Sequence, residues 1–196
     1  MIEFIEKIQE VLPYDREKYI DFLDDEFEGP TEWCGVSFQL VGEEREVGLE
    51  KFIGNYENLF RSIVLKLDRD SFWIINHDDK DLKWFPNEED NLTSLRSLFK
   101  QNKIPNTFIG ALIFMRDDLL KFSKDLISYP FAVFNEEGLL YKNLDISHSE
   151  LQFIIKISGH WNIDFLSTDK ELLKRIVTEN SSSIFNVKQY NGTSLW

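Results

Sequence analysis

The sequence predicts a single α+β domain, with a mainly antiparallel sheet and helices packed on one face of it. Its 196 residues suit one hydrophobic core. The chain is 42% hydrophobic and contains 17 Phe, enough apolar material to offset the entropy lost when an acidic chain becomes ordered. Hairpin signals outnumber strand-helix-strand units. No repeat or linker divides the chain, so we expect one domain over residues 1–196.

The first third, residues 1–60, is predicted to be rich in helices. Apolar residues at helical spacing predict a helix over residues 2–12. Asp15 is a typical N-cap for a second helix, which we expect to end at Gly29-Pro30. Alternating apolar and polar residues predict a strand over 36–40, and a third helix is expected at roughly 46–60.

Residues 61–196 are predicted to be rich in strands. Helices are expected after Asn91 or Thr93, at about 117–127, and over STDKELLKRIV, with Ser167 or Thr168 as its cap. Short β-prone segments bounded by turn signals predict strands at 62–67, 71–76, 82–85, 108–115, 131–134, 139–144, 151–158, 161–166 and 183–190.

Charge is the most informative bulk property. The chain has 35 acidic and 22 basic residues, for a net charge of −13. Residues 1–60 carry 16 Asp or Glu and 5 Lys or Arg, so nearly all of the excess lies in that third. This asymmetry argues against direct binding of nucleic acid, which needs clustered Lys and Arg, and favours a basic protein partner. The alternative is that the acidic excess only maintains solubility.

The sequence also predicts the compartment. The first ten residues lack the basic start and apolar core of a secretory signal, and the apolar run at 108–115 is too short to cross a membrane. The lone cysteine, Cys34, has no second cysteine with which to form an internal disulfide. We therefore expect a cytoplasmic protein without membrane association.

Candidate catalytic and metal-binding residues are few. His148 and His160, with Asp164, have the chemistry to hold zinc or to exchange protons near neutral pH, although a strand between the two histidines would separate them. The Asp-rich turn at 77–81 is typical of a hairpin, and the acidic surroundings of Cys34 do not suit a reactive thiolate. Motifs such as GxSxG, HExxH and CxxC are absent. We expect no metal or cofactor, and an enzyme is the less favoured class.

The stretch DFLDDEFEGPTEWCG, residues 21–35, is the main candidate for partner binding. Its apolar residues recur at helical spacing, which predicts an ordered helix with an acidic outer side. Trp33 follows in a loop, where we expect an exposed aromatic ring to act as a hot spot for a basic partner. The predicted partner-binding residues are Asp21, Asp24, Asp25, Glu28, Glu32, Trp33, Glu43, Glu44 and Glu46.

A small, strongly acidic α+β protein without catalytic motifs resembles, as a type, the bacterial immunity and antitoxin proteins that neutralise basic toxins such as nucleases. The resemblance is one of composition. It favours an inhibitor that binds a basic partner by charge complementarity. Two alternatives stay open: an enzyme that uses a metal or His148 and His160, and a nucleic-acid mimic that occupies a DNA-binding protein.

Overall fold

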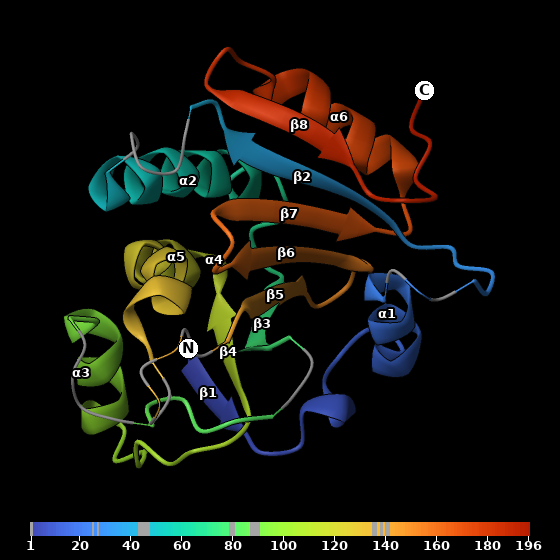
Figure 1. Ribbon diagram of the computed structural model, residues 1–196. Helices are drawn as coiled ribbons and strands as arrows, with labels where there is room; N and C mark the ends of the chain where they lie inside the picture. The colour runs from blue at the N-terminus through green and yellow to red at the C-terminus, as the bar shows by residue number, and fades with distance from the viewer. Residues whose placement is uncertain are drawn as a thin grey trace.

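The computed structural model describes residues 2–24, 26, 28–42, 48–78, 81–86, 91–134, 137, 139 and 142–196. Within these residues, eight strands form one antiparallel sheet in the order β1-β4-β3-β5-β6-β7-β2-β8 (Figure 1). The strands are β1 (Ile2–Ile5), β2 (Cys34–Leu40), β3 (Phe72–His77), β4 (Ala111–Met115), β5 (Leu144–His148), β6 (Phe153–Ser158), β7 (Asn162–Ser167) and β8 (Phe185–Gln189).

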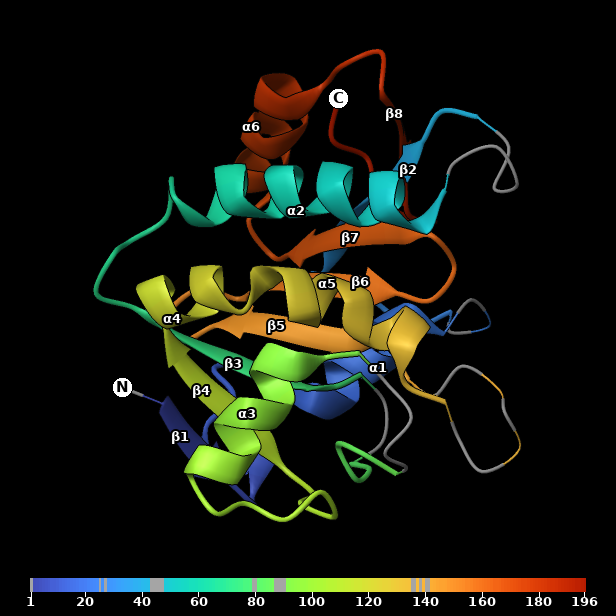
Figure 2. The same ribbon diagram turned by 90° about the vertical axis from the view of Figure 1, so that its left-hand side faces the viewer.

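The helices lie on both faces of this sheet. They are the 3-10 helix η1 (Ile8–Glu10) and the α-helices α1 (Arg16–Leu23), α2 (Leu49–Val64), α3 (Thr93–Gln101), α4 (Arg116–Lys121), α5 (Ser123–Ala132) and α6 (Lys170–Asn180). Helices α2 to α6 share one face, whereas α1 lies on the opposite face (Figures 1 and 2). The predicted α+β class and antiparallel sheet are confirmed, with α1 as an exception to the single helix layer.

The main core lies between the sheet and helices α2 to α6. Side chains alternate along each strand, so Phe153, Ile155 and Ile157 of β6 point toward these helices. Their neighbours Ile154 and Lys156 point toward the other face, which we call the open face. The first third of the chain is part of the same sheet, because β1 forms one edge and β2 lies between β7 and β8.

The helix predicted over residues 2–12 is wrong. Ile2–Ile5 form an edge strand paired with β4, and a 3-10 helix follows at Ile8–Glu10. The apolar spacing of this segment fits a helix, but pairing with β4 satisfies the inner side of its backbone, and half-buried Phe4 packs against Phe99 and Phe108. Tertiary contacts therefore override the local pattern.

Four predicted strands are also wrong. Of the strand predicted at 139–144, only Leu144 among the described residues is in a strand, where it begins β5. Residues 62–64 continue α2, because Phe60, Ile63 and Val64 extend its buried face. Residues 131–132 end α5. Within 82–85, the structure forms only an isolated bridge between Lys83 and Ile109.

Several other predictions are confirmed. Asp15 caps α1, its carboxylate accepting hydrogen bonds from the backbone of Glu17 and Lys18, although the helix ends at Leu23, before Gly29-Pro30. β3, β4 and the β6–β7 hairpin form where expected, as do α3 and edge strand β8. α6 forms too, but its cap is Asp169 instead of Ser167 or Thr168. In the described part of the chain, no helix has the length and apolarity needed to cross a bilayer.

Candidate functional site

A line of polar side chains crosses the open face of the sheet. Strand pairing aligns one residue from each of six neighbouring strands, and we call this set the polar row. Its members, from β3 to β8, are Asn76, Asp145, Lys156, Asp164, Ser37 and Lys188. All except Lys188 are buried. Because buried polar groups carry a desolvation cost, a buried row of this kind needs its own partners.

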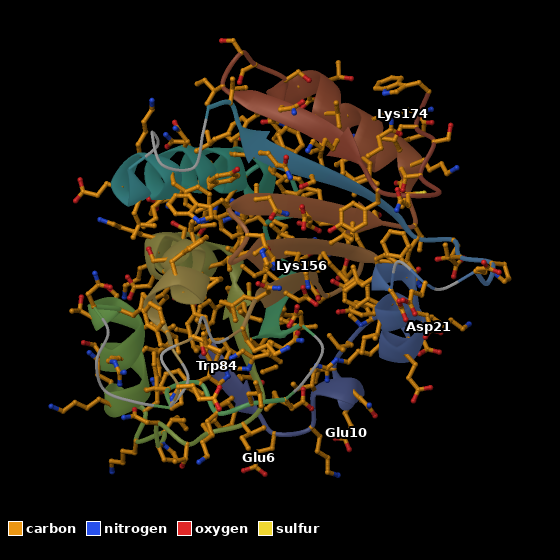
Figure 3. All side chains as sticks on the ribbon, viewed as in Figure 1. Glu6, Glu10, Asp21, Trp84, Lys156 and Lys174 are labelled. Atoms are coloured by element: carbon orange, nitrogen blue, oxygen red, sulfur yellow. The ribbon has the colours of Figure 1, made fainter. Side chains whose placement is uncertain are left out.

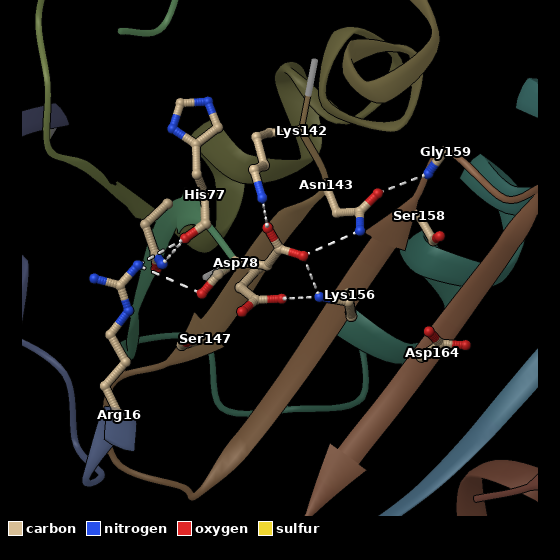
Figure 4. A network of polar contacts seen from close by, with 12 residues as sticks. Arg16, His77, Asp78, Lys142, Asn143, Ser147, Lys156, Ser158, Gly159 and Asp164 are labelled. Atoms are coloured by element: carbon tan, nitrogen blue, oxygen red, sulfur yellow. Dashed lines mark hydrogen bonds and ion pairs between the residues drawn. The ribbon is translucent and has the colours of Figure 1, made fainter. Parts of the chain in front are cut away.

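Lys156 lies at the centre of this row (Figure 4). Its ammonium lies 2.6 Å from Asp78 Oδ2 and 3.7 Å from Asp145 Oδ1. Asn143 connects the cluster to the β6–β7 turn, because its amide donates to Asp78 while its carbonyl accepts from the Gly159 backbone. Although burial works to lower the pKa of Lys156, Asp145 and Asp78 outweigh it and raise the pKa. Lys156 is therefore held in its charged form.

The two carboxylates beside Lys156 have different acidities. Burial works to raise the pKa of Asp78, but the Lys156 ammonium and hydrogen bonds outweigh it and lower the pKa to about 2. Burial raises the pKa of Asp145 to about 6, and Lys156 offsets only part of this effect. Asp145 is 0% exposed, and neither of its oxygens accepts a hydrogen bond of ordinary geometry from the described residues. Its charge is therefore poorly stabilised.

Asp164 completes the buried charge cluster on β7. Its carboxylate accepts hydrogen bonds from the Asn162 amide and, at 2.8 Å, from the Tyr190 hydroxyl. Burial raises its pKa, and these hydrogen bonds oppose the shift.

Polar contacts also attach the start of α1 to this face. The Arg16 guanidinium donates to Asp81 Oδ1 at 2.7 Å and to the His77 carbonyl at 3.1 Å. The Tyr14 hydroxyl lies 3.0 Å from Ser147 Oγ. These contacts place α1 beside the polar row.

Aromatic side chains pack the rest of α1 against strands β6 and β7. Tyr19 and Trp33 pack with Ile154 and Leu166, and Phe22 stacks on Tyr190. Trp33 is only 5% exposed. The expectation of an exposed ring at Trp33 is therefore wrong, because the indole is needed to bury the inner side of α1.

The carboxylates predicted to bind a partner lie on the outer side of this same segment. Asp21, Asp24, Glu28 and Glu32 are exposed, and Asp21 points outward from α1 (Figure 3). Beside them is a depression of about 610 Å³, here called the acidic groove, which is lined by Lys18, Asp21, Pro30, Thr31, Glu32 and Trp33. The predicted residues Asp25, Glu43, Glu44 and Glu46 lie outside the described residues.

The structure does not bring the alternative catalytic residues together. His148 ends β5, where its Nδ1 accepts hydrogen bonds from the backbone of Glu150 and Leu151 and its ring packs on Trp73. His160 is exposed in the turn at the opposite end of β6. Asp164 is engaged with Asn162 and Tyr190. His148 belongs to a segment, residues 145–150, that is largely strand β5.

Comparisons of the chain with protein-family models, curated proteins and solved structures found no match. The chemistry of the site must therefore be read from its own geometry. Among the described residues, no group of three or more His, Cys, Asp or Glu side chains is placed to hold a metal ion. The candidate site is the outer side of α1 with the acidic groove, next to the polar row on the open face.

Sequence reasoning missed the polar row. A signal was present, because Asp145, Lys156 and Asp164 each lie between two apolar neighbours, and Lys156 and Asp164 do so within predicted strands. Such positions usually face solvent. Their burial follows from the placement of α1 and from strand neighbours that are distant in sequence.

Proposed function

We propose that this protein is an inhibitor of the immunity or antitoxin type, which binds a basic protein partner such as a nuclease toxin through the acidic groove. The observation that carries the proposal is the two-sided character of segment 16–33. Its aromatic side packs against the sheet, and its described carboxylates are exposed on the other side. An ordered acidic surface can meet a cationic partner without a large ordering cost.

The distribution of charge supports the same function. Asp21 and Glu32 border the groove, and among the described residues that line it Lys18 is the one cation. A Lys or Arg side chain entering the groove would gain favourable charge interactions at its head and apolar contact with Pro30 along its stem. Long-range attraction to the acidic first third of the chain would accelerate association.

The partner to test first is the product of the gene adjacent to that of this protein, because a toxin and its inhibitor need to be produced together. Association rates are measured by surface-based kinetics at 50 and 500 mM salt. We expect a basic partner that binds, with an association rate falling on the order of tenfold over this range.

Charge-neutralised variants locate the surface. The triple variant Asp21→Asn, Asp24→Asn, Glu32→Gln should slow association about tenfold at low salt. A matched control, Asp117→Asn, Glu171→Gln, Glu179→Gln, removes three exposed carboxylates elsewhere and should have a much smaller effect. An association rate that changes neither with salt nor in the triple groove variant would contradict the proposal. Competition by duplex DNA for the same partner would instead favour the nucleic-acid-mimic alternative.

A further inference from the structure

Strand β8 forms one edge of the sheet. Among the described strands it pairs with β2 alone, and it ends the strand order at the top of the molecule (Figure 1). The Val41 N–H donates to the Ile184 carbonyl at 2.8 Å, and the Tyr190 N–H donates to the Gly35 carbonyl at 2.9 Å. The even-numbered residues of this segment therefore bond to β2. Because bonded and non-bonded pairs alternate along an antiparallel ladder, the odd-numbered residues direct their backbone groups away from β2.

These outward-facing residues are Phe185, Val187 and Gln189. The Phe185 N–H donates to the Ser182 carbonyl at 3.3 Å, within the turn that precedes β8. The backbone N–H and carbonyl groups of Val187 and Gln189 have no hydrogen-bond partner among the described residues. The segment after β8 turns toward β2, where the Thr193 hydroxyl accepts a hydrogen bond from the strand backbone. A free edge of this kind is where a further strand can pair.

The surface around this edge differs in charge from the rest of the protein. Residues 181–196 contain one charged side chain, that of Lys188. Residues 170–196, which also include α6, carry four basic and two acidic side chains, a net +2 in a chain whose total is −13. Two copies therefore repel each other less at this edge than across the acidic first third of the chain. A basic protein, of the kind proposed for the acidic groove, gains no such advantage here.

The strand is complementary to itself. An antiparallel pairing of β8 with β8 of a second copy, centred on Val187, uses every residue of both strands. It sets Val187 opposite Val187, Phe185 opposite Gln189 and Asn186 opposite Lys188. The bonded pairs of this ladder are the odd-numbered residues, whose backbone groups already point outward. A ladder centred one residue later would place Lys188 opposite Lys188, which like-charge repulsion disfavours.

Side chains on the open face fit the same register. Ile184 is 47% exposed, and Val41 beside it is 60% exposed. The pairing places Ile184 opposite the half-buried ring of Tyr190 of the second copy, and symmetry repeats this contact at the other end of the ladder. A lysine on an edge strand often prevents pairing. In this register, however, Lys188 meets the Asn186 amide, whose carbonyl accepts a hydrogen bond from an ammonium group.

We propose that two copies of this protein associate through β8, antiparallel about a twofold axis at Val187, to form one continuous sheet. Because each copy contributes a single short strand, the interface falls at the small end of the range, below roughly 1,200 Å² in total. We therefore expect a reversible dimer with a dissociation constant of roughly 10–500 μM. The proposal does not rest on the function proposed above, since segment 16–33 takes no part in the pairing.

The first test is sedimentation of the whole protein from about 5 μM to about 1 mM. We expect the weight-average mass to rise from that of one 23.2 kDa chain toward twice that value. A mass that stays at one chain up to about 1 mM would overturn the proposal. Growth beyond two copies would overturn it too, because a twofold pairing closes on itself.

Amide hydrogen exchange locates the interface. At the higher concentration we expect slower exchange at the outward N–H groups of Val187 and Gln189. The Asn186 N–H, which faces β2, is the internal control and should exchange at the same rate at both concentrations. A rise in mass without added protection at Val187 would place the association on another surface and contradict the proposal.

Charge variants at Asn186 test the register. Asn186→Lys sets two lysines opposite each other twice in the dimer and should weaken it about fivefold, whereas Asn186→Asp creates two ion pairs with Lys188 and should strengthen it about fivefold. Both changes are made at an exposed position, so the fold should persist. Gln101→Lys and Gln101→Asp, on exposed α3, are the matched controls for net charge. Equal effects at the two positions, or shifts of the same sign in both Asn186 variants, would overturn the proposal.

Discussion

Lys156 and Asp78 are 78 positions apart in sequence, yet the ammonium of one lies 2.6 Å from a carboxylate oxygen of the other in a buried part of the open face. This contact joins β6 to the end of β3. The contact offsets the desolvation of both groups, because each charge provides a favourable interaction in place of the water that the other lost on burial.

Removal of Lys156 should be costly. Lys156→Met leaves Asp78 and Asp145 buried without their shared ammonium, and we expect a loss of about 3–5 kcal/mol in the free energy of unfolding. The double variant with Asp78→Asn should lose less than the sum of the single variants, since it removes one stranded charge. Urea denaturation measures both.

The control for this cycle is Lys174→Met. Lys174 pairs with Glu171 at 2.6 Å on exposed α6, where an ion pair contributes less than about 1 kcal/mol. Equal losses for the two lysines would show that the Lys156 cluster has no special role in stability.

Asp145 should make the protein less stable as pH rises. Its folded pKa of about 6 exceeds the ordinary pKa of 3.8, so the folded state binds this proton more tightly. The resulting stability is present below pH 3.8 and is lost as pH rises through 6, a change of about 3 kcal/mol. Asp145→Asn should remove this dependence, so the variant gains stability relative to wild type between pH 4 and 7. Urea denaturation across this range tests it, with exposed Asp21→Asn as the control for removing a carboxylate outside the buried cluster.

The stability contributed by His77 should change with pH in the opposite direction, over nearly the same pH range. Burial lowers its pKa from 6.5 to about 4, although Asp78 and Asp81 oppose the shift. Its contribution is present above pH 6.5 and is lost as pH falls through 4, again by about 3 kcal/mol. The two contributions offset each other in the wild type. Stability measured from pH 4 to 6.5 should therefore fall with pH in His77→Gln, whose amide can still bond to Tyr129, and rise with pH in Asp145→Asn. Slopes of the same sign would contradict this account.

Local patterns predicted the elements whose contacts are themselves local. The β6–β7 hairpin pairs Lys156 with Asp164 across a short turn, and Asp15 caps its own helix. The order of the whole sheet follows from pairings between distant segments, such as the insertion of β2 between β7 and β8. No local pattern specifies that insertion, so the polar row could not be assembled from the sequence.

The candidate site was predictable to a similar extent. Exposure of Asp21, Asp24, Glu28 and Glu32 follows from the helical spacing of their apolar neighbours. The burial of Trp33 does not, because it depends on α1 occupying the face of the sheet opposite to the other helices. An aromatic residue in an acidic loop is therefore weak evidence for a contact surface until its packing is known.

Trp33 should be essential for holding α1 on the sheet. Trp33→Ala removes the ring that contacts Tyr14, Tyr19 and Phe22, and we expect a loss of about 3–5 kcal/mol. Because these contacts belong to a separate small cluster, limited proteolysis should cut between residues 24 and 33 before the sheet unfolds. Trp196→Ala is the control, since that side chain is 74% exposed and its removal should have little effect.

The position of edge strand β1 depends on Gly110, the residue directly before β4, the strand with which β1 pairs. Gly110 has a φ of +149°, and a Cβ atom there would lie 2.1 Å from the Ile5 carbonyl oxygen. Gly110→Ala should therefore displace β1 and the residues packed behind it, at a cost of more than about 2 kcal/mol. Gly54→Ala is the matched control, because its Cβ would meet nothing within 4 Å in the middle of α2 and alanine favours a helix. It should raise the free energy of unfolding by about 0.5–1 kcal/mol. If the close approach of β1 to Gly110 is required, the free energy of unfolding falls in Gly110→Ala and rises in Gly54→Ala. An unchanged free energy of unfolding in Gly110→Ala would show that the close approach is not required.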